Sequence, residues 1–325
     1  MKRVFSGIQP SGEPHLGNYA GALLNWVRLQ AEYECIYCIV DYHALTQSHD
    51  AALLAPRTLD MATAILAAGV DPERATLFVQ SAVPEHTELA WLFNCVTPLG
   101  ELERMTQFKD KAARDRKNIN VGLLSYPVLQ AADIALYRGE LVPVGEDQVQ
   151  HLELAREIVR RFNARYGEVF PEPQPLLSTA KRILGLDGQA KMSKSLGNTL
   201  AMLASPEEIW EKLRPAVTDA RRVRRSDPGE PEDCNIFTIH KAFTDEAKRA
   251  ELAAGCRSAG IGCFDCKRVL ADNIDAQLAP VRDRYLALAE HPERVREVLA
   301  AGAERCRRIA REVLAAARDA MGLMR

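Results

Sequence analysis

Short apolar runs alternate with longer amphipathic runs through the first 200 residues of the chain. The short runs predict β-strands at residues 3–8, 35–40, 76–80 and 141–144. The longer runs keep helical spacing of their apolar positions and predict helices at 16–33, 51–68, 86–96, 123–137 and 147–166. Strands that alternate with helices are typical of βαβ units, so we expect an α/β domain with a Rossmann-like parallel sheet.

The pattern changes after about residue 197, where strand-like runs stop. Helical patterns follow at 206–214, 235–242, 245–255, 268–288 and 293–320, and a polar stretch at 218–233 predicts a loop. We therefore expect an α/β domain over 1–189 and an all-helical C-terminal domain over 190–325. The last helix, about 293–325, is expected to pack back on the first domain.

Composition narrows the classes of protein that fit. The chain has 325 residues, 47% of them hydrophobic, which is enough for a large core. A net charge of −2 does not exclude an RNA partner, because local patches steer binding. We find neither a secretory leader nor an apolar run of about 18 residues, so we expect a cytoplasmic protein without a membrane span. In a reducing cytosol, clustered cysteines indicate metal ligation rather than disulfides.

Two segments carry candidate phosphate chemistry. The sequence GIQPSGEPHLGNY occupies residues 7–19, between a predicted strand and a predicted helix, and such a strand–loop–helix can cradle phosphate groups. The sequence KMSKS occupies residues 191–195, and its two ammonium groups suit pyrophosphate oxygens. The alternatives are a Gly/Pro turn without ligand and a solvated Lys/Ser loop.

A third candidate is the turn that follows the predicted strand 141–144. It reads Gly145-Glu146-Asp147-Gln148 and lies at the carboxyl edge of the sheet, where such folds bind ligands. Asp147 can accept a hydrogen bond from a ribose hydroxyl. The alternative is an acidic first turn that only stabilises the following helix.

Together the first two segments resemble the HIGH and KMSKS signatures of class I aminoacyl-tRNA synthetases. The form of residues 7–19 resembles the tryptophanyl branch, with Asn18 in place of the final His of HIGH. The resemblance covers nearly the whole chain and is strongest over 1–200. It implies that the protein activates L-tryptophan with ATP and Mg²⁺ and transfers it to the acceptor end of tRNA(Trp). It also implies an anticodon-binding helical domain and a homodimer, with no role for DNA.

The resemblance assigns residues to these tasks. His15, Asn18, Lys191 and Lys194 are the implied catalytic residues. The implied ATP site comprises Gln9, Pro10, Ser11, Gly17, Asn18, Gly145, Glu146, Asp147, Ile183, Lys191, Met192, Ser193, Lys194 and Ser195. The implied tryptophan site comprises Asp133, Phe5, Gly7, Val40, His43 and Gln148.

Asp133 is the implied reader of the indole. It is the one carboxylate on a mostly apolar predicted helix, and an indole offers only an N–H donor. A carboxylate that merely pairs with another residue is the alternative. For the whole chain the alternatives are a tyrosyl-tRNA synthetase, since a phenol also suits an Asp, and a non-catalytic RNA-binding paralogue that senses redox state.

Four cysteines form a separate candidate site. Cys234, Cys256, Cys263 and Cys266 have the spacing C-x21-C-x6-C-x2-C, with the last two on a predicted chelating turn. Four thiolates bind zinc or a [4Fe–4S] cluster, and free buried thiols are the third possibility. The pattern resembles a bacterial subset of the family with a [4Fe–4S] cluster. The remaining cysteines, Cys35, Cys38, Cys95 and Cys306, are expected in the core.

Two further surfaces are expected from the sequence. Met105 and Phe108 are apolar positions among charges in a segment, about 100–120, that resembles the family's dimer interface. Basic residues of the helical domain are candidate RNA contacts: Arg221, Arg222, Arg224, Arg225, Lys267 and Arg268. A solvated basic loop is the alternative for these.

Overall fold

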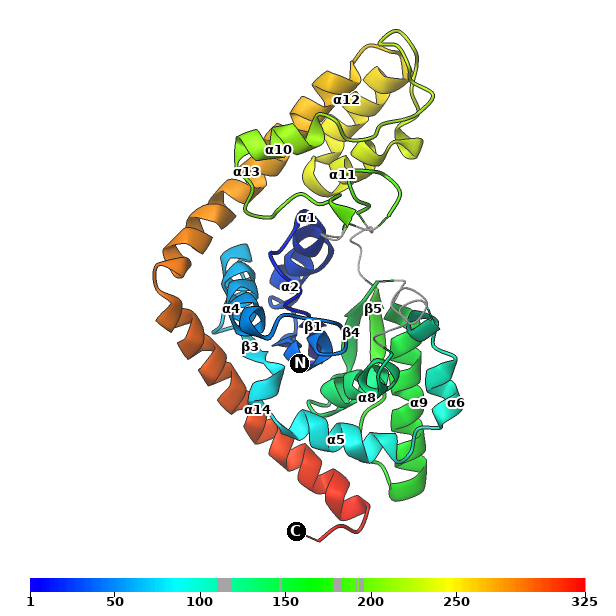
Figure 1. Ribbon diagram of the computed structural model, residues 1–325, viewed down its shortest axis with the longest axis vertical. Coiled ribbons are helices and arrows are strands. Elements are labelled where there is room, and N and C mark those ends of the chain that lie inside the picture. The colour runs from blue at the N-terminus through cyan, green and yellow to red at the C-terminus, as the bar shows by residue number, and fades with distance from the viewer. Residues whose placement is uncertain (110–118, 146–147, 178–182, 191, 193–195, 325) are drawn as a thin grey trace.

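A five-stranded parallel sheet organises the first half of the chain. The computed structural model describes all residues except 110–118, 146–147, 178–182, 191, 193–195 and 325. Its strands are β1 (Arg3–Ile8), β2 (Glu34–Ile39), β3 (Ala75–Val79), β4 (Leu141–Val144) and β5 (Gln174–Leu177). They pair in the order β3-β2-β1-β4-β5, and every pair is parallel. The expected Rossmann-like fold is thereby confirmed (Figure 1).

Strand boundaries follow the sequence patterns closely, with one omission. The first and fourth strands match the expected ranges, and β2 and β3 each begin one residue earlier than expected. The sequence analysis missed β5 because Pro173 and Pro175 interrupt its apolar run. Proline removes a hydrogen-bond donor, and an edge strand such as β5 tolerates that loss.

The helices that surround the sheet are α3 (Asp41–Ala44), α4 (Ala51–Ala68), α5 (Glu85–Asn94), α6 (Leu99–Glu103), α8 (Val121–Ala135) and α9 (Val149–Tyr166). Of these, α4, α5, α8 and α9 begin and end near their expected positions, whereas the short α3 and α6 were not expected. The expected helix at 16–33 is interrupted: α1 (Leu16–Asn18) and α2 (Leu24–Leu29) flank a π-helical turn at Tyr19–Leu23. Such turns insert a residue into a helix and are frequent near functional sites.

The two faces of the sheet bury two separate apolar clusters. Successive side chains of a strand point to opposite faces. Val4 therefore packs with Trp26 and Met61, on the face covered by α2 and α4, whereas Phe5 packs with Val128 and Ile158, on the face covered by α8 and α9. The first cluster continues into the C-terminal helices through Ile236 and Leu270, so one core joins both halves of the chain.

The C-terminal half is helical in the part that the structure describes, apart from an isolated bridge at Ala201 and a short 3₁₀ turn at Pro231–Asp233. Its helices are α10 (Pro206–Leu213), α11 (Asn235–Phe243), α12 (Glu246–Arg257), α13 (Cys263–Ala289) and α14 (Pro292–Ala320). The sequence analysis started α13 at residue 268, but Gly262 is its N-cap. Cys263 and Cys266 therefore lie on the first turn of a long helix rather than on a separate loop.

The last two helices form a long arm along one side of the molecule (Figure 1). Helix α14 lies against β3, α4 and α5. Its Gly302 meets the sheet so closely that a Cβ atom there would lie 1.9 Å from the carbonyl oxygen of Leu77. Only glycine permits this approach of helix and strand.

Helix α4 is long and apolar enough to cross a membrane by length and composition alone. It is not an uninterrupted apolar run, because Arg57 and Asp60 lie within it. The helix packs against α13 and α14, and its buried face includes Met61 and Ile65. The hydroxyl of Tyr285 on α13 donates a hydrogen bond to Asp60, in the middle of α4. In this structure α4 is a core helix whose apolar face contacts protein.

Candidate active site

The loop after β1 begins the candidate site at the centre of the sheet. Chain order reverses between β1 and β4, and in such folds ligands bind at the carboxyl ends of these strands. Gly12 turns this loop with a φ of +113°. The chain then enters α1, where the backbone N–H of His15 donates to Oδ1 of Asn18 at 3.1 Å. The Asn18 side chain thus fixes the start of the helix that faces the crevice.

The segment that follows the Lys/Ser sequence pairs with this loop. His15 and Ala201 form an antiparallel bridge, and the N–H of Leu16 donates to the carbonyl of Leu200 at 2.8 Å. The N–H of Met202 donates to the carbonyl of Pro14 at 2.9 Å. Two segments nearly 200 residues apart in the sequence are therefore joined by backbone hydrogen bonds.

Met192 brings the centre of the Lys/Ser sequence to the same place. It is buried, and a Cβ atom at Gly17 would lie 3.4 Å from its own Cβ atom. Ile183 is also buried, in the cluster that contains Leu16 and Met192. The predicted residues Lys191, Ser193, Lys194 and Ser195, and likewise Glu146 and Asp147, lie outside the described residues.

Asp133 lies on α8 at the opposite side of the sheet's carboxyl edge. It is buried, and its Oδ2 atom is 2.7 Å from Nε2 of His43. Its Oδ1 atom is 2.7 Å from Nδ1 of His86 and accepts a hydrogen bond from Nε2 of Gln80 at 2.7 Å. Burial by itself raises the pKa of this carboxyl, but the charges and hydrogen bonds of His43 and His86 outweigh burial and hold the pKa well below its usual value. Asp133 is thus an ionised acceptor in an apolar wall.

Sequence reasoning identified His43 but missed two partners of Asp133. Gln80 follows β3 directly, and His86 lies in the first turn of α5. Polar residues that follow a parallel strand reach the carboxyl edge of the sheet, and that signal could have identified both. Nε2 of His86 lies 2.7 Å from the hydroxyl of Tyr137, which extends the network away from the site.

A second polar network lies beside the first. The hydroxyl of Tyr126 is 2.7 Å from Nε2 of His151 and 3.1 Å from Oε1 of Gln107. The ring of Tyr126 meets the ring of His43 edge-on, with centroids 6.1 Å apart. Because His43 also contacts Asp133, the two networks adjoin at this histidine.

The remaining predicted residues lie along the same edge. Phe5 is buried and stacks on Tyr137, with ring centroids 5.6 Å apart. A Cβ atom at Gly7 would meet Cγ1 of Val40 at 2.8 Å, so β1 and the end of β2 approach closely here. Gln148 donates its N–H to the carbonyl of Gly145 at 3.0 Å and is the N-cap of α9. Gln9 is half-buried, Pro10 buried and Ser11 exposed in the loop after β1.

The four clustered cysteines line one small pocket between α11, α12 and α13. Its volume is about 20 Å³, and its other walls include Ile236, Phe237 and Ile261. Nη1 of Arg222 lies 3.7 Å from Sγ of Cys256. Burial raises the pKa of Cys266 to about 12, and its three neighbouring cysteines add to the rise. The Cys266 thiol is therefore protonated at neutral pH.

The donor set of this pocket suits a thiolate-bound group. Four thiols, apolar walls and a guanidinium that offsets thiolate charge fit either zinc or an iron–sulfur cluster. In the described residues, however, no three His, Cys, Asp or Glu side chains lie close enough to hold a single metal ion as placed. Binding would thus draw the thiols into new positions and release their protons.

Several surface expectations were wrong. Cys95 is exposed, although Cys35, Cys38 and Cys306 are buried as expected. Met105 is buried against the α8 side of the core, so it is not free to contact a second copy.

The expected RNA contacts divide into engaged and open side chains. Lys267 is buried, and its ammonium donates to the carbonyls of Arg214 at 2.7 Å and Ala216 at 2.6 Å. Arg222 points into the cysteine pocket, and Arg268 stacks 3.4 Å from the centroid of Trp210. Arg224 and Arg225 are exposed. Lys267 is thereby removed from the candidates.

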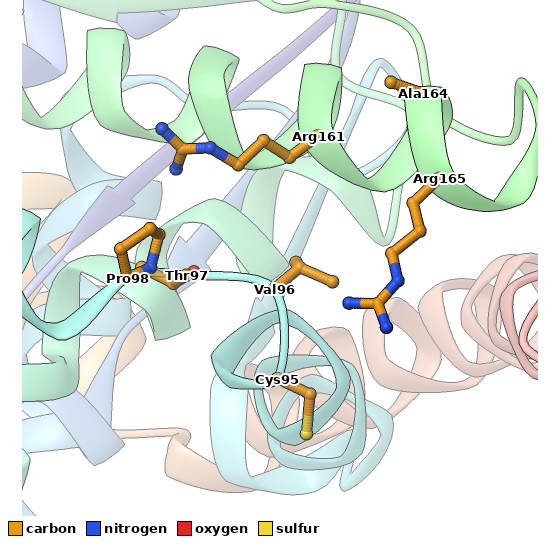
Figure 2. A pocket seen from close by; sticks show the side chains of 7 residues that line it. All are labelled: Cys95, Val96, Thr97, Pro98, Arg161, Ala164 and Arg165. Carbon is orange, nitrogen blue, oxygen red and sulfur yellow. The ribbon is translucent and has the colours of Figure 1, made fainter.

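A surface hollow of about 500 Å³ lies elsewhere, between the end of α5 and α9 (Figure 2). Cys95, Val96 and Arg165 line it, and none of the motif residues does. Arg161, also at its rim, is paired with Glu101 at 2.5 Å. Its size therefore does not make it the candidate site, because the chemistry is at the edge of the sheet.

Comparison with known proteins gives consistent likenesses. The profile of the family described as tRNA synthetases class I (W and Y) matches residues 1–279. The chain is 51% identical to a tryptophan–tRNA ligase of Deinococcus radiodurans over the full length of both proteins. It is 45% identical to a tryptophan–tRNA ligase of Thermotoga maritima, over 99% of each.

Solved structures agree with this likeness. The tryptophanyl-tRNA synthetase of Campylobacter jejuni, crystallised with ADP and tryptophan, has a TM-score of 0.86 at 39% identity and covers 99% of this chain and 100% of its own. A tyrosyl-tRNA synthetase of Archaeoglobus fulgidus, complexed with L-tyrosine, has a TM-score of 0.71 at 27% identity over 87% of this chain and 90% of its own.

Proposed function

Because the chain belongs to the class I tRNA synthetases of the tryptophan and tyrosine family, and is an ATP-dependent tryptophan–tRNA ligase, we propose which of its residues perform each step. This activity rules out the tyrosyl and non-catalytic alternatives. We propose residues 1–189 as the catalytic domain and 190–325 as the Lys/Ser segment with the anticodon-binding domain. The observation that carries the proposal is the backbone pairing of residues 14–16 with residues 200–202.

The ATP triphosphate is proposed to bind between the loop after β1 and the Lys/Ser segment, which this backbone pairing joins at their bases. A carboxylate oxygen of tryptophan attacks the α-phosphorus of Mg-ATP, a P–O bond to pyrophosphate breaks, and tryptophanyl-adenylate forms. No protein nucleophile is needed, because the carboxylate is already ionised, and catalysis consists of positioning and charge stabilisation. His15, Asn18 and the N–H groups at the start of α1 bind phosphate oxygens. Lys191 and Lys194 offset the charge that builds on the leaving pyrophosphate.

The rest of the ATP site follows the carboxyl edge of the sheet. Gln9, Pro10, Ser11 and Gly17 approach the phosphates, and the turn at 145–147 holds the ribose through Asp147. Ile183 and Met192 supply apolar contact to the adenine, with Ser193 and Ser195 as further donors. The adenylate then loses AMP when a ribose hydroxyl at the end of tRNA(Trp) attacks its carbonyl carbon.

Asp133 selects the indole. Its carboxylate is ionised and can only accept hydrogen bonds. It therefore suits the indole N–H, which is a donor, and offers no hydrogen bond to a ligand group that can only accept one. His43, His86 and Gln80 hold it in one orientation. Phe5, Gly7 and Val40 form the apolar wall, and Gln148 lies where it can bind the polar end of the amino acid.

We propose that Cys234, Cys256, Cys263 and Cys266 hold a [4Fe–4S] cluster, with zinc as the alternative. The four-thiol donor set supports both groups. The spacing of the four cysteines resembles that of family members with a [4Fe–4S] cluster, and this resemblance is the reason for naming the cluster ahead of zinc. Either group would cross-link the loop before α11 to α12 and α13 and so stabilise the domain that binds the anticodon.

The protein is proposed to act in the cytoplasm as a homodimer. The exposed apolar side chains of Trp91 and Leu99, on α5 and α6, replace Met105 as the apolar candidates for that contact. The exposed Arg224 and Arg225 are the proposed contacts to tRNA phosphates.

Exchange of labelled pyrophosphate into ATP tests the site assignment. The wild type should exchange with tryptophan and not with tyrosine, and Lys194→Ala should lower the rate about a hundredfold. Lys212→Ala, which removes an exposed cation on α10, is the matched control and should leave the rate unchanged. Equal rates for wild type and Lys194→Ala would refute the role of that ammonium.

A further inference from the structure

The base of the Lys/Ser segment is a closed backbone junction. The N–H of Gly185 donates to the carbonyl of Ala190 at 2.7 Å, and the N–H of Leu186 donates to the carbonyl of Asn198 at 2.9 Å. A Cβ atom at Gly185 would lie 2.1 Å from Nδ2 of Asn198. Leu186 and Asn198, which flank residues 187–197 in the sequence, are thus hydrogen-bonded to each other, and Gly185 packs against this junction.

A side chain from the helical domain binds this junction. Asn235, the first residue of α11, donates from Nδ2 to the carbonyl oxygen of Gly185 at 2.8 Å. Its Cβ atom also packs near Gly188, where an added Cβ atom would lie 3.4 Å away. Ile236, the next residue, is buried in the cluster that contains Leu186 and Met192. Helix α11 is thus a rigid support on which Asn235 is presented.

The other half of the Asn235 amide is left without a partner among the described residues. Its Oδ1 atom is buried and accepts no hydrogen bond there. A buried acceptor that lacks a donor destabilises a fold, so an apolar residue would serve packing better at this position. An amide is nevertheless present at residue 235, and among the described residues its one side-chain hydrogen bond is the one that Nδ2 donates to the carbonyl of Gly185, at the base of the Lys/Ser segment.

We propose that Asn235 is a positioning residue for ATP, which acts by holding the junction of Gly185, Leu186 and Asn198 at the base of the Lys/Ser segment. This inference rests on the proposed role of that segment in ATP binding. Asn235 directly follows Cys234, so it also joins the cysteine site to the catalytic site through one peptide unit. The tryptophan site, with Asp133 on α8, lies outside this connection, and the effect of Asn235 should fall on ATP alone.

The test compares Asn235→Asp with Asn273→Asp in full-length protein with its native metal content. Asn273 is a matched control because its Nδ2 also donates one hydrogen bond at 2.8 Å, to Oγ1 of Thr244, within the same helical half. Asn235→Asp keeps the size of the side chain but replaces the donor with a carboxylate that faces a carbonyl oxygen. We expect the KM for ATP to rise roughly three- to tenfold in pyrophosphate exchange, with the KM for tryptophan unchanged. Asn273→Asp should leave both values unchanged.

Asn235→Ala is a second variant without added charge, and it should raise the KM for ATP in the same way. Iron and zinc are measured in every preparation, and variants are compared at equal content. The proposal is overturned if the KM for ATP stays within twofold of wild type, if both KM values rise together, or if the change disappears at equal metal content. A wild type without tryptophan-dependent exchange would refute the proposed function instead, and equilibrium binding of a non-hydrolysable ATP analogue would then still report on Asn235.

Discussion

Replacing Asp133 with asparagine tests the buried network at the centre of the tryptophan site. The two side chains have the same shape, but asparagine has one acceptor oxygen and places an NH₂ group where Oδ2 now faces Nε2 of His43. At least one of the three hydrogen bonds to Asp133 is lost, and a buried donor is left facing another donor. Asp133→Asn should therefore destabilise the protein by about 3–5 kcal/mol.

The pH dependence of stability gives a second, independent readout of the same network. Because the folded-state pKa of Asp133 lies below its ordinary value of 3.8, its contribution to stability is complete above that pH and is lost as the pH falls below it. Wild type should lose stability on acidification below about pH 4 more steeply than Asp133→Asn. In pyrophosphate exchange the variant should lose about 10- to 100-fold in kcat/KM for tryptophan, since the indole loses its charged acceptor.

Urea unfolding, followed by circular dichroism between pH 3 and pH 8, measures the first two effects. Asp50→Asn is the control, because Asp50 is an exposed N-cap whose carboxylate accepts from the N–H of Ala52 at 2.9 Å. Asparagine caps helices equally well, so this variant should remain within about 0.5 kcal/mol of wild type. If Asp133→Asn unfolds at the same urea concentration as wild type and keeps its acid sensitivity, the charge of Asp133 does not support the network.

Three other expectations follow from the geometry. Gly302→Ala should destabilise the protein by about 1–3 kcal/mol in urea unfolding, because its Cβ atom would overlap the Leu77 carbonyl, and a neutral or stabilising result would contradict the close approach of α14. Leu99→Glu should shift the proposed homodimer toward monomer in analytical ultracentrifugation, and a sedimentation profile equal to that of wild type would exclude α6 from the interface. Cys263→Ser should lower bound iron or zinc, measured by elemental analysis, and Cys95→Ser should not, since Cys95 lies outside the pocket.

The sequence predicted most of the fold because local patterns specify it. The apolar run of β1 carries no proline and that of β4 only Pro143, neither has a competing helical period, and both strands begin and end where expected. The rule that ligands bind at the carboxyl edge also led to the expectation that the loop after β1 and the turn after β4 contribute to one site. In β5, Pro173 and Pro175 concealed a strand that tertiary pairing with β4 stabilises.

The partners of side chains were much harder to predict. Asp133 contacts His43, Gln80 and His86, which come from three different elements, and although Gln80 and His86 follow a strand, no sequence spacing pairs them with Asp133. Lys267 looked like a surface cation, but its ammonium satisfies the last carbonyls near α10, a role that depends on how two helices cross. Such pairings arise from tertiary packing and are invisible to spacing alone.

The contact between Gly302 and β3 has a consequence for biosynthesis. Strand β3 is the outermost strand on its side of the sheet, and an uncovered outer strand can pair with another chain. On the ribosome, residues 75–79 are synthesised long before α14, the helix that covers them. The nascent polypeptide therefore exposes β3 as an edge strand until its translation is almost finished. Premature termination of translation before codon 302 would leave β3 uncovered in the released product. We expect such a truncated product to aggregate.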